Sequence, residues 1–566
     1  MEKDKYGLHW IYTKTKGIRL QLTIYALLAL CIPVVQLVFA FLMKQFIDIA
    51  TSDIDMPLLH VVFRTIALIA IGGTVIMINS ILSKWIYGKM ECNLRAELMD
   101  IIFSRRMIDI SKQHTGELLT KLTADVGAVS TCFKTIIDNM VGGAVSALLA
   151  TAGLFFLNWK IAIILLVLTP LLMLLMGALA PHIQKASDND KRNDEVNRSM
   201  IQENLSRIML IKTYFTQKKT IETVRSAYKN KLKSGMELGK WEGLSSFAGL
   251  LFGNAMATVT LGLGVYLVLR GETTVGSLIA IVQLLNYIVT PIGKFPEAIA
   301  QTSQAVASSA RIGMIYKLPA DREIPALMPA NATELVVKDL CFSYGGASED
   351  GDRGNLLDSV NMSFSKGEVT GVVGESGSGK STLLKLLIGL YTPRMGTVEL
   401  KHASGVLSGE EIMPQVAYVP PDDYLFSGSV SENIIMSENE PRYDEMQAAA
   451  SDANIIEFIQ SLPNGFDTLL GESGGTVSSG QAQRIAIARA IYKKARIVVF
   501  DEPTANLDVD SIEKFQSVVK YLAKDKICII VTHDVSTMTA CDKIYVLEHG
   551  SVREKLSGEE LLLDNE

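Results

Sequence analysis

The sequence predicts a multidomain fold: a six-helix transmembrane domain with long cytoplasmic helical extensions, followed by an α/β domain built around a P-loop. Three observations lead to this prediction. Apolar residues make up 48% of the 566 residues, and they are concentrated in the first half of the chain. A glycine-rich loop, GESGSGKST at 374–382, lies between an apolar strand and a helix. A second apolar strand, in RIVVFDEP at 496–503, ends in two carboxylates.

The first half of the chain contains six apolar stretches near the ~20 residues that a helix needs to cross a bilayer. The third and fourth are separated only by Asn158–Lys160, which predicts a tight turn. The first stretch is too long for the core of a signal peptide and lacks a cleavage-site pattern, so we expect it to stay in the membrane. A buried core helix is the alternative for any one stretch, but six in succession argue against it. The predicted spans are 21–43, 61–83, 139–157, 161–180, 246–269 and 276–297.

Charge predicts the orientation of these spans. Lys and Arg are frequent in 84–138 and 181–245 and rare in the short loops at 44–60 and 158–160. The positive-inside tendency therefore places both long segments and both termini in the cytoplasm of a multi-pass plasma-membrane protein. Both long segments have few helix breakers, which predicts helices that continue beyond the bilayer. The formal net charge of −6 gives no indication of nucleic-acid binding.

The composition also suggests where the domains divide. We predict a transmembrane domain over 1–310, a proline-containing linker over 311–332 and a nucleotide-binding domain over 333–566. The six cysteines form neither a CxxC pair nor a metal-ligand cluster, so free thiols are expected.

The loop at 374–382 has the residue types that a phosphate-binding site needs. Glycines at 374, 377 and 379 allow the backbone to approach phosphate oxygens closely, and the N-terminus of the following helix favours anions. Lys380 is predicted to reach the β- and γ-phosphates, and Ser381 to hold Mg²⁺. The predicted nucleotide-binding residues here are Gly374, Glu375, Ser376, Gly377, Ser378, Gly379, Lys380, Ser381 and Thr382.

The two carboxylates after the second strand suit the hydrolysis of the bound nucleotide. Asp501 is placed to hold the Mg²⁺ shell through water, and Glu502 to polarise the attacking water beside the γ-phosphate. Between the P-loop and this strand, Thr476–Ala495 has apolar residues at helical spacing after serines that can cap a helix.

At this point the chain resembles the ATP-binding cassette (ABC) family, whose motifs occur in order over 333–566. VSSGQ at 477–481 is similar to the family's LSGGQ signature, and Tyr344 to the aromatic residue that stacks on adenine. His533 resembles the switch histidine that contacts the γ-phosphate. Leu470–Glu472 is similar to the loop that touches the membrane domains, and ANLD at 505–508 to the D-loop. The resemblance thus adds Tyr344, Ser478, Gly480, Gln481 and Asp508 to the nucleotide-binding residues and His533 to the catalytic ones.

Two positions depart from the family pattern. Pro421, followed by Asp422 and Asp423, stands where the family has a glutamine that touches Mg²⁺ and the attacking water. A water or one of the aspartates could substitute, or turnover could be slow. Ser479 stands where the family usually has glycine. Three outcomes are open: its Cβ obstructs close approach of the backbone to the nucleotide, it requires strained dihedrals, or it is tolerated.

The resemblance implies ATP and Mg²⁺ as cofactors and a half-transporter that exports its substrate by alternating access. It also implies a dimer, with a homodimer favoured and a heterodimer open. Coupling helices are expected near Ser104–Gly116 and Ile211–Lys218. Three alternatives are an importer with the exporter fold, a regulatory or low-turnover cassette protein, and a soluble cassette ATPase, which the six spans argue against. Drug, lipid, peptide and siderophore substrates remain open. Candidate cavity residues, which more often bond between helices, are Gln36, Asn79, Asn254, Gln283 and Asn286.

Overall fold

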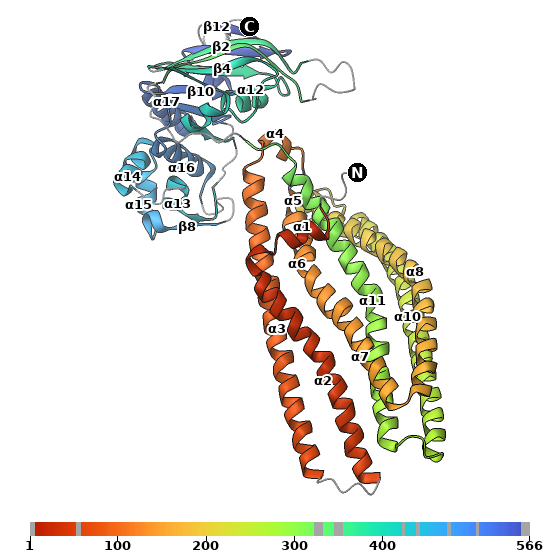
Figure 1. The fold of residues 1–566 in the computed structure, drawn as a ribbon. Helices are drawn as coiled ribbons and strands as arrows, with labels where there is room; N and C mark the ends of the chain where they lie inside the picture. Colours follow the sequence, from red (N-terminus) through yellow and green to blue (C-terminus); the bar gives the residue numbers. More distant parts are fainter. Residues whose placement is uncertain are drawn as a thin grey trace. The chain divides into compact units, whose positions relative to one another are not determined.

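A computed structural model of the chain contains two compact units (Figure 1). One unit comprises Met1–Phe103 and Gln113–Leu318, and the other comprises Ser104–Lys112 and Pro319–Glu566. The first is helical and the second is α/β. The structure describes residues 6–51, 58–321, 332–344, 355–403, 405–421, 425–436, 442–471, 477–504 and 509–555.

Six long helical segments form the first unit, because apolar stretches of this length bury their backbone groups most readily as helices. Shorter helices, α1 (Leu8–Thr13), α5 (Thr115–Thr120), α6 (Val126–Thr135) and α9 (Ile208–Thr213), join or extend them, with π-helical turns at Lys121–Asp125 and Ile136–Val141. The long segments are α2 (Arg19–Thr51), α3 (Leu58–Phe103), α7 (Gly142–Leu157), α8 (Trp159–Ser206), α10 (Gln217–Leu269) and α11 (Val275–Tyr316).

Five helical stretches of the described residues are long and apolar enough to cross a membrane. They contain the predicted spans that begin at 21, 61, 139, 246 and 276. The predicted span 161–180 lies in α8, where the apolar stretch found among the described residues is the shorter Trp159–Leu171. The sixth span therefore stays a prediction. The five stretches are Lys16–Thr51, Leu58–Phe103, Thr115–Leu157, Gln217–Leu269 and Val275–Tyr316.

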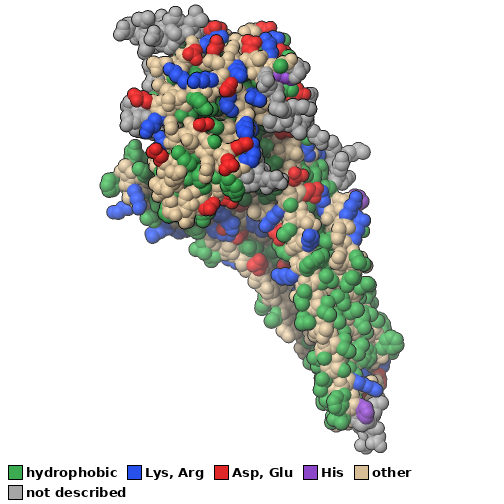
Figure 2. Space-filling view, turned by 90° about the vertical axis from the view of Figure 1, so that its left-hand side faces the viewer, with side chains coloured by type: hydrophobic (Ala, Val, Ile, Leu, Met, Phe, Trp, Pro, Cys, Tyr) green, Lys and Arg blue, Asp and Glu red, His purple; other side chains and the backbone are tan. Residues whose placement is uncertain are grey.

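The surface of these helices is apolar. Phe63, Ile66 and Ile69 on α3 are each more than half exposed, as are Leu148 on α7 and Leu166 on α8. Figure 2 shows hydrophobic side chains crowded over the lower part of the helical unit, with charged side chains gathered towards its upper part. An apolar surface of this extent is expected of a protein solvated by lipid.

The turn predicted between the third and fourth spans is one residue long. Helix α7 ends at Leu157 and α8 begins at Trp159, with Asn158 in an extended conformation between them. The Asn158 side chain accepts hydrogen bonds from the backbone N–H groups of Lys160 (3.1 Å) and Ile161 (3.3 Å). Asparagine is a favoured N-cap for this reason, so one residue both ends a helix and starts the next.

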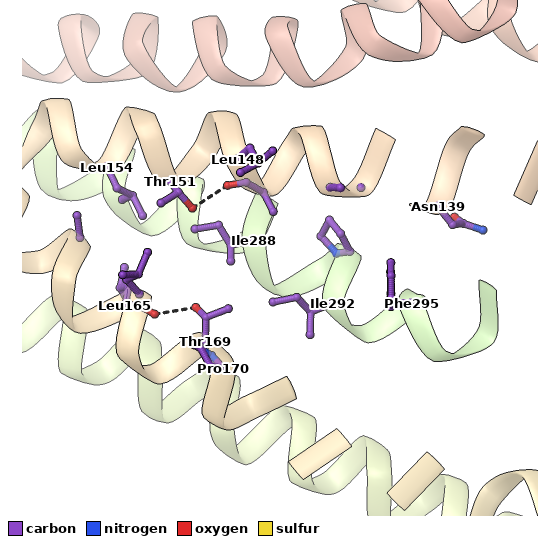
Figure 3. Close-up of a pocket in the computed structure, with 16 residues that line it drawn as sticks. Asn139, Leu148, Thr151, Leu154, Leu165, Thr169, Pro170, Ile288, Ile292 and Phe295 are labelled. Atoms are coloured by element: carbon purple, nitrogen blue, oxygen red, sulfur yellow. Dashed lines mark hydrogen bonds between the residues drawn. The ribbon is translucent and has the colours of Figure 1, made fainter. Parts of the chain in front are cut away.

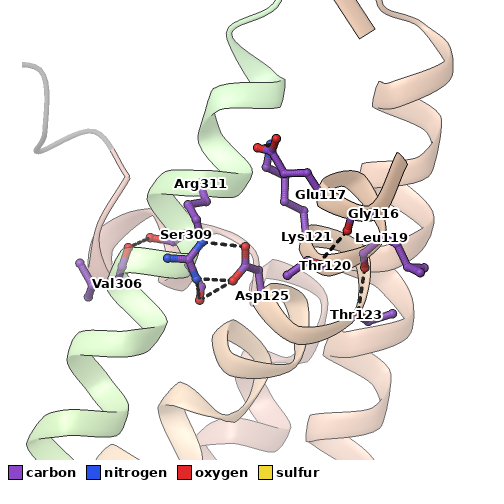
Figure 4. A network of polar contacts seen from close by, with 11 residues as sticks. Gly116, Glu117, Leu119, Thr120, Lys121, Thr123, Asp125, Val306, Ser309 and Arg311 are labelled. Atoms are coloured by element: carbon purple, nitrogen blue, oxygen red, sulfur yellow. Dashed lines mark hydrogen bonds and ion pairs between the residues drawn. The ribbon is translucent and has the colours of Figure 1, made fainter. Parts of the chain in front are cut away.

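An ion pair between a buried carboxylate and a half-exposed guanidinium joins two elements of the helical unit (Figure 4). Asp125, at the end of a π-helical turn, is almost fully buried. Its carboxylate accepts hydrogen bonds from Arg311 Nε (2.9 Å), from Arg311 Nη2 and from Ser308 Oγ (2.9 Å). Arg311 and Ser308 lie on α11, so the carboxylate fixes this helix against the π-helical turn.

Replacing Arg311 with alanine is expected to destabilise the helical unit. Arg311→Ala leaves the buried Asp125 carboxylate with one of its two donor residues, a loss of about 1–3 kcal/mol because the guanidinium is half exposed to water. The apparent Tm in detergent should fall by roughly 2–10 °C. Arg198→Ala is the matched control, because the Arg198 side chain in its ion pair with Asp194 is 81% exposed. Equal melting of the two variants would contradict the assignment.

The second unit is built on a six-stranded sheet in the order β12-β11-β3-β10-β9-β6. All neighbours are parallel except β11 and β12. Residues of β9 and β10 alternate between two apolar clusters, one with Val498 and Phe500 and the other with Ile497 and Val499, so both faces of the sheet are covered. The strands are β3 (Val369–Gly374), β6 (Val416–Val419), β9 (Ile497–Asp501), β10 (Ile527–Val531), β11 (Lys543–Glu548) and β12 (Ser551–Lys555).

Two smaller sheets complete this unit. An antiparallel sheet has the order β2-β1-β4-β5, from Leu357–Ser365, Ala332–Phe342, Met395–His402 and Gly405–Ser408. Strands β7 (Gly428–Ser429) and β8 (Leu469–Leu470) form a short pair. The helices are α12 (Lys380–Leu387), α13 (Val430–Ile435), α14 (Tyr443–Asp452), α15 (Ile456–Ser461), α16 (Ser479–Tyr492), α17 (Val509–Ala523) and α18 (Val535–Met538).

The segment 104–112, where one coupling helix is predicted, belongs to the second unit. It forms a four-residue helix, α4 (Met107–Ile110), and Ile108 packs against the cluster that contains Leu386 and Tyr391. The other predicted coupling segment coincides in part with α9. Helix α11 runs on to Tyr316, beyond the predicted end of the first domain at 310, because its apolar face continues through Ile312 and Ile315.

Candidate nucleotide-binding site

At several points of the loop between β3 and α12, the backbone conformation or the space around it suits only glycine. Gly377 and Gly379 have φ of +86° and +105°, in the left-handed region that other residues rarely adopt. A Cβ at Gly374 would lie 2.4 Å from the carbonyl oxygen of Leu547 and 2.8 Å from Ser378 Oγ. The loop is therefore a tight turn that brings its backbone N–H groups to the N-terminus of α12.

Lys380 is held by the loop that it follows. It is 9% exposed, and its Nζ donates hydrogen bonds to the carbonyl oxygens of Gly374 (2.7 Å) and Glu375 (2.8 Å). Ser378 Oγ is buried and has no hydrogen-bond partner among the described residues. A buried ammonium and an unmet hydroxyl beside a helix N-terminus fit a bound phosphate group. Ser376, Ser381 and Thr382 lie on the same loop and first turn.

Tyr344 lies beside this loop. Its hydroxyl is 2.8 Å from Thr382 Oγ1, and its half-exposed ring meets the rings of Phe342 and Tyr391 edge-on. The structure thus places the predicted adenine-stacking residue next to the P-loop, although the stacking itself stays a prediction.

The carboxylates of Asp501 and Glu502 lie at the C-terminal end of β9. Asp501 is 9% exposed, and burial raises the pKa of its carboxyl group. Tyr418 Oη opposes that rise by donating a hydrogen bond to Asp501 Oδ2 at 3.0 Å. An ionised Asp501 is the form that can hold a divalent cation, so this hydrogen bond favours the functional state.

Glu502 is brought to His533 by the parallel sheet. It has φ of +47°, and its backbone N–H donates to the carbonyl oxygen of Val531 at 2.8 Å. Strain of this kind costs about 1–3 kcal/mol and occurs mainly at functional sites. The Glu502 carboxylate Oε1 is 3.2 Å from His533 Nδ1. Two residues that are 31 positions apart therefore form one polar pair beside the P-loop strand.

Tyr418 is a site residue that the sequence reasoning missed. It lies on β6, the neighbour of β9, two residues before the Pro420–Pro421 pair that follows the strand. The sequence carries no signal for this contact, because the pairing of β6 with β9 is what brings the Tyr418 hydroxyl to the Asp501 carboxylate. Asp422 and Asp423, the predicted substitutes for the family glutamine, lie outside the described residues.

Removing the Tyr418 hydroxyl is expected to weaken Mg²⁺ use. Tyr418→Phe deletes one hydrogen bond to the Asp501 carboxylate, worth about 0.5–1.5 kcal/mol. The Mg²⁺ concentration for half-maximal ATPase activity should therefore rise roughly 2- to 10-fold, with ATP binding in the absence of metal unchanged. Tyr443→Phe, on the exposed first residue of α14, is the matched control. An unchanged Mg²⁺ dependence would show that this hydroxyl has no role.

The signature segment forms a capped helix start. Ser478 is the N-cap of α16: its Oγ accepts from Gln481 N–H (3.3 Å), and its own N–H donates to Gln481 Oε1 (2.9 Å). Ser479 is the first residue of the helix and has no positive φ. The strained dihedrals named as one consequence of its Cβ do not occur, because the position takes ordinary helical geometry. Gly480 follows in the first turn.

Several predicted residues cannot be placed. Glu472 and the D-loop residues 505–508, Asp508 included, lie outside the described residues. Leu470 pairs with Gly428 in the short β7–β8 sheet. The chain thus brings together the P-loop, Tyr344, Asp501, Glu502 and His533, whereas Ser478, Gly480 and Gln481 stand on a separate helix start.

A P-loop after β3, with two carboxylates at the end of β9 in the same parallel sheet and apolar helices of membrane-spanning length in the same chain, defines a membrane-bound P-loop ATPase. The comparisons with known proteins agree. The family model described as the ABC transporter transmembrane region matches residues 22–292, and the one described as ABC transporter matches residues 357–505. The chain belongs to the ABC transporter family, and it is a multi-pass membrane protein that uses ATP.

Relatives cover most of the chain. An ATP-dependent lipid A-core flippase of Burkholderia thailandensis is 26% identical over 85% of this chain and 80% of its own length. The pediocin PA-1 transport/processing ATP-binding protein PedD of Pediococcus acidilactici is 29% identical over 90% of this chain and 71% of its own length. A solved bacterial Atm1-family ABC exporter with ATP bound is 22% identical, with a TM-score of 0.79 over 97% of both chains, and so shares the fold.

Proposed function

We propose that this chain is one half of an ATP-driven exporter that works as a dimer in the plasma membrane. The observation that carries the proposal is the meeting of Lys380, Asp501, Glu502 and His533 around one end of a parallel sheet, in a chain with membrane-spanning helices. Soluble cassette ATPases lack such helices.

The site residues suggest a division of labour in hydrolysis. Bound Mg²⁺ would neutralise phosphate charge, with Ser381 and Asp501 as its protein-side partners. Lys380 orients the terminal phosphates, and the loop N–H groups bind their oxygens. Glu502 takes the proton of the attacking water, and His533 holds the Glu502 carboxylate at 3.2 Å. Tyr344 contacts the base.

Two features of the single chain support a dimer. The signature residues Ser478, Gly480 and Gln481 stand on a separate helix start, and the family resemblance assigns them to a nucleotide held by a second subunit. Helix α9 and its following turn also expose large apolar side chains, with Met209 79% and Phe215 86% exposed. Apolar side chains at a predicted cytoplasmic turn indicate a protein partner. We favour a homodimer, because this chain itself carries Lys380, Asp501, Glu502 and His533.

The orientation follows the distribution of cations. We place the ATPase domain, both termini and the long helical extensions in the cytoplasm. The long extensions are rich in Lys and Arg, and such segments tend to stay on the cytoplasmic side of a membrane. The domain boundaries 1–310, 311–332 and 333–566 are part of the same proposal. Relatives are named for lipid A-core and for pediocin, which favours a lipid or peptide substrate among the open classes.

The experiment is to express the chain alone, reconstitute it in lipid nanodiscs and measure its mass and ATPase rate. A dimer whose hydrolysis rises with added substrate supports the proposal. An inactive monomer that gains activity only with a second half-transporter would exclude the homodimer. An inactive dimer revived by Ser479→Gly would identify the signature as the limiting element. If the substrate moves inward in vesicles of known orientation, the chain is an importer and not an exporter.

Pro421 carries a second candidate function. A regulatory or low-turnover cassette protein is favoured by the loss of the glutamine side chain at this position. ATPase activity that no substrate stimulates would support this second function.

A further inference from the structure

Glu502, the proposed general base, begins a short stretch that has left the central sheet. Strand β9 ends at Asp501, and Glu502–Thr504 continue the chain beyond it. Glu502 has a φ of +47° although it precedes Pro503, and a residue before proline is normally extended. A strained backbone of this kind persists only where the surrounding structure holds it. The contacts of this stretch therefore decide where the Glu502 carboxylate lies.

Each of the three residues of the stretch is tied to a different segment of the chain. The backbone N–H of Glu502 donates to β10, as described above. The carbonyl oxygen of Pro503 accepts a hydrogen bond from Gln483 Nε2 on α16. Thr504 Oγ1 donates to Asp534 Oδ2, in the turn after β10, at 3.2 Å. We call these three hydrogen bonds the Glu502 clamp.

The hydrogen bond from Gln483 satisfies a group that has few alternatives. Proline has no N–H, so the carbonyl oxygen is the single polar group of Pro503. Both residues are buried, and a buried carbonyl oxygen without a donor is costly. The bond therefore fixes the chain directly after Glu502. Gly480 of the signature lies within one turn of Gln483 on the same helix, so α16 both presents the signature and holds the chain beside Glu502.

The hydrogen bond from Thr504 belongs to a small cluster. Thr504 and Thr537 are buried, and their hydroxyl oxygens lie 2.6 Å apart. Both lie within hydrogen-bonding distance of Asp534 Oδ2, at 3.2 and 3.3 Å. Thr504 lies two residues after Glu502, and Asp534 directly follows His533. The cluster thus joins the two segments that present the Glu502–His533 pair.

Threonine hydroxyls can instead be satisfied within their own helix. In the apolar cavity of about 490 Å³ between α7, α8 and α11, Thr151 and Thr169 donate at 2.7 Å to backbone carbonyls of their own helices (Figure 3). Such bonds are local and hold no second segment. The Thr504–Asp534 bond spans 30 positions of the sequence, so it fixes the tertiary structure around the catalytic pair.

We propose that Gln483 and Thr504 are positioning residues for Glu502. Their hydrogen bonds keep the Glu502 carboxylate beside His533, where it can take the proton of the attacking water. Neither residue takes part in the proton transfer itself. The inference rests on the proposed function for the role of Glu502, and it names the residues on which that role depends.

The test compares ATPase turnover with nucleotide binding by the full chain in lipid nanodiscs. Gln483→Met keeps the length of the side chain but removes the donor, and Thr504→Val keeps its shape but removes the hydroxyl. Each variant should lower the turnover number by about 10- to 100-fold, because a small displacement of a catalytic group has an effect of this size. The affinity for a fluorescent ATP analogue should be unchanged. Thr504→Ser keeps the hydroxyl and should retain most of the wild-type turnover.

Gln460→Met and Thr370→Val are the matched controls, and both should turn over at the wild-type rate. Gln460 is exposed on α15, and Thr370 is buried on β3 with a hydroxyl that has no partner among the described residues. A control that loses as much turnover as its matched variant would overturn the proposal. So would a parallel loss of analogue binding in the two clamp variants, or a Thr504→Ser variant as slow as Thr504→Val.

The Glu502→Gln background distinguishes positioning from a general effect on the domain. Gln483→Met and Thr504→Val should cause little further loss there, because no carboxylate is left to misplace. A further loss as large as in the wild-type background would overturn the proposal. If Glu502→Gln alone keeps its turnover, the proposed role of Glu502 fails and the positioning role fails with it. If Glu502→Gln is inactive while both clamp variants hydrolyse ATP at the wild-type rate, the positioning role alone fails.

Discussion

Glu502→Gln is expected to retain ATP binding and to lower the ATPase turnover number by about 10²-fold or more, the usual range for loss of a general base. Glutamine keeps the size of the side chain and a hydrogen-bonding oxygen near His533, but it cannot take a proton from water. We expect the left-handed backbone at 502, with its φ of +47°, to be kept in this variant.

The measurement pairs steady-state hydrolysis with equilibrium binding of a fluorescent ATP analogue. Glu548→Gln is the matched control, because Glu548 is an exposed residue at the end of β11 in the same domain. If Glu502→Gln hydrolyses ATP at a rate within a factor of a few of the wild-type rate, Glu502 is not the general base.

Lys380→Ala is expected to lower both ATP affinity and turnover. The substitution removes charge-assisted hydrogen bonds to the β- and γ-phosphates, and a total loss of about 1.5–3 kcal/mol would lower the affinity roughly 10- to 150-fold. Among the described residues, Lys380 Nζ donates to the carbonyl oxygens of Gly374 and Glu375, which water can hydrate when the side chain is removed. Expression and membrane insertion should be unaffected.

Binding of the same fluorescent analogue checks this expectation, with Lys520→Ala as the control on the exposed face of α17. Unaltered affinity in Lys380→Ala would mean that the loop does not bind phosphate through this residue. Because the Glu502 variant separates hydrolysis from binding and the Lys380 variant affects both, the two together distinguish the catalytic group from the binding group.

Features that depend on local chain chemistry could be predicted from the sequence. The turn at Asn158, the P-loop between β3 and α12 and the capped start of α16 each rest on a few adjacent residues. Their signals are a capping side chain, glycines at fixed spacing and a serine followed three residues later by glutamine. Five of the predicted spans lie in helices of sufficient length and hydropathy for the same reason.

Features that depend on pairing of distant segments could not be predicted in this way. Tyr418 and Asp501 are 83 positions apart, and they meet because β6 lies beside β9. Asp125 and Arg311 are 186 positions apart, and the pair needs a π-helical turn that no local pattern signals. The Glu502–His533 pair was not predicted, because the resemblance assigned His533 only to the γ-phosphate and strand order is a tertiary property.

The backbone conformation of Glu502 sets a limit on how far the stability of this protein can be raised at the catalytic residue. A φ of +47° suits glycine or asparagine better than a longer side chain, so the chain carries local strain at the residue that hydrolysis most requires. Substitutions that relieve this strain remove the carboxylate, and those that keep the carboxylate keep the strain. Selection for a more heat-resistant form would therefore have to act elsewhere, in the packing of the sheet or of the helices, and leave this residue as it is.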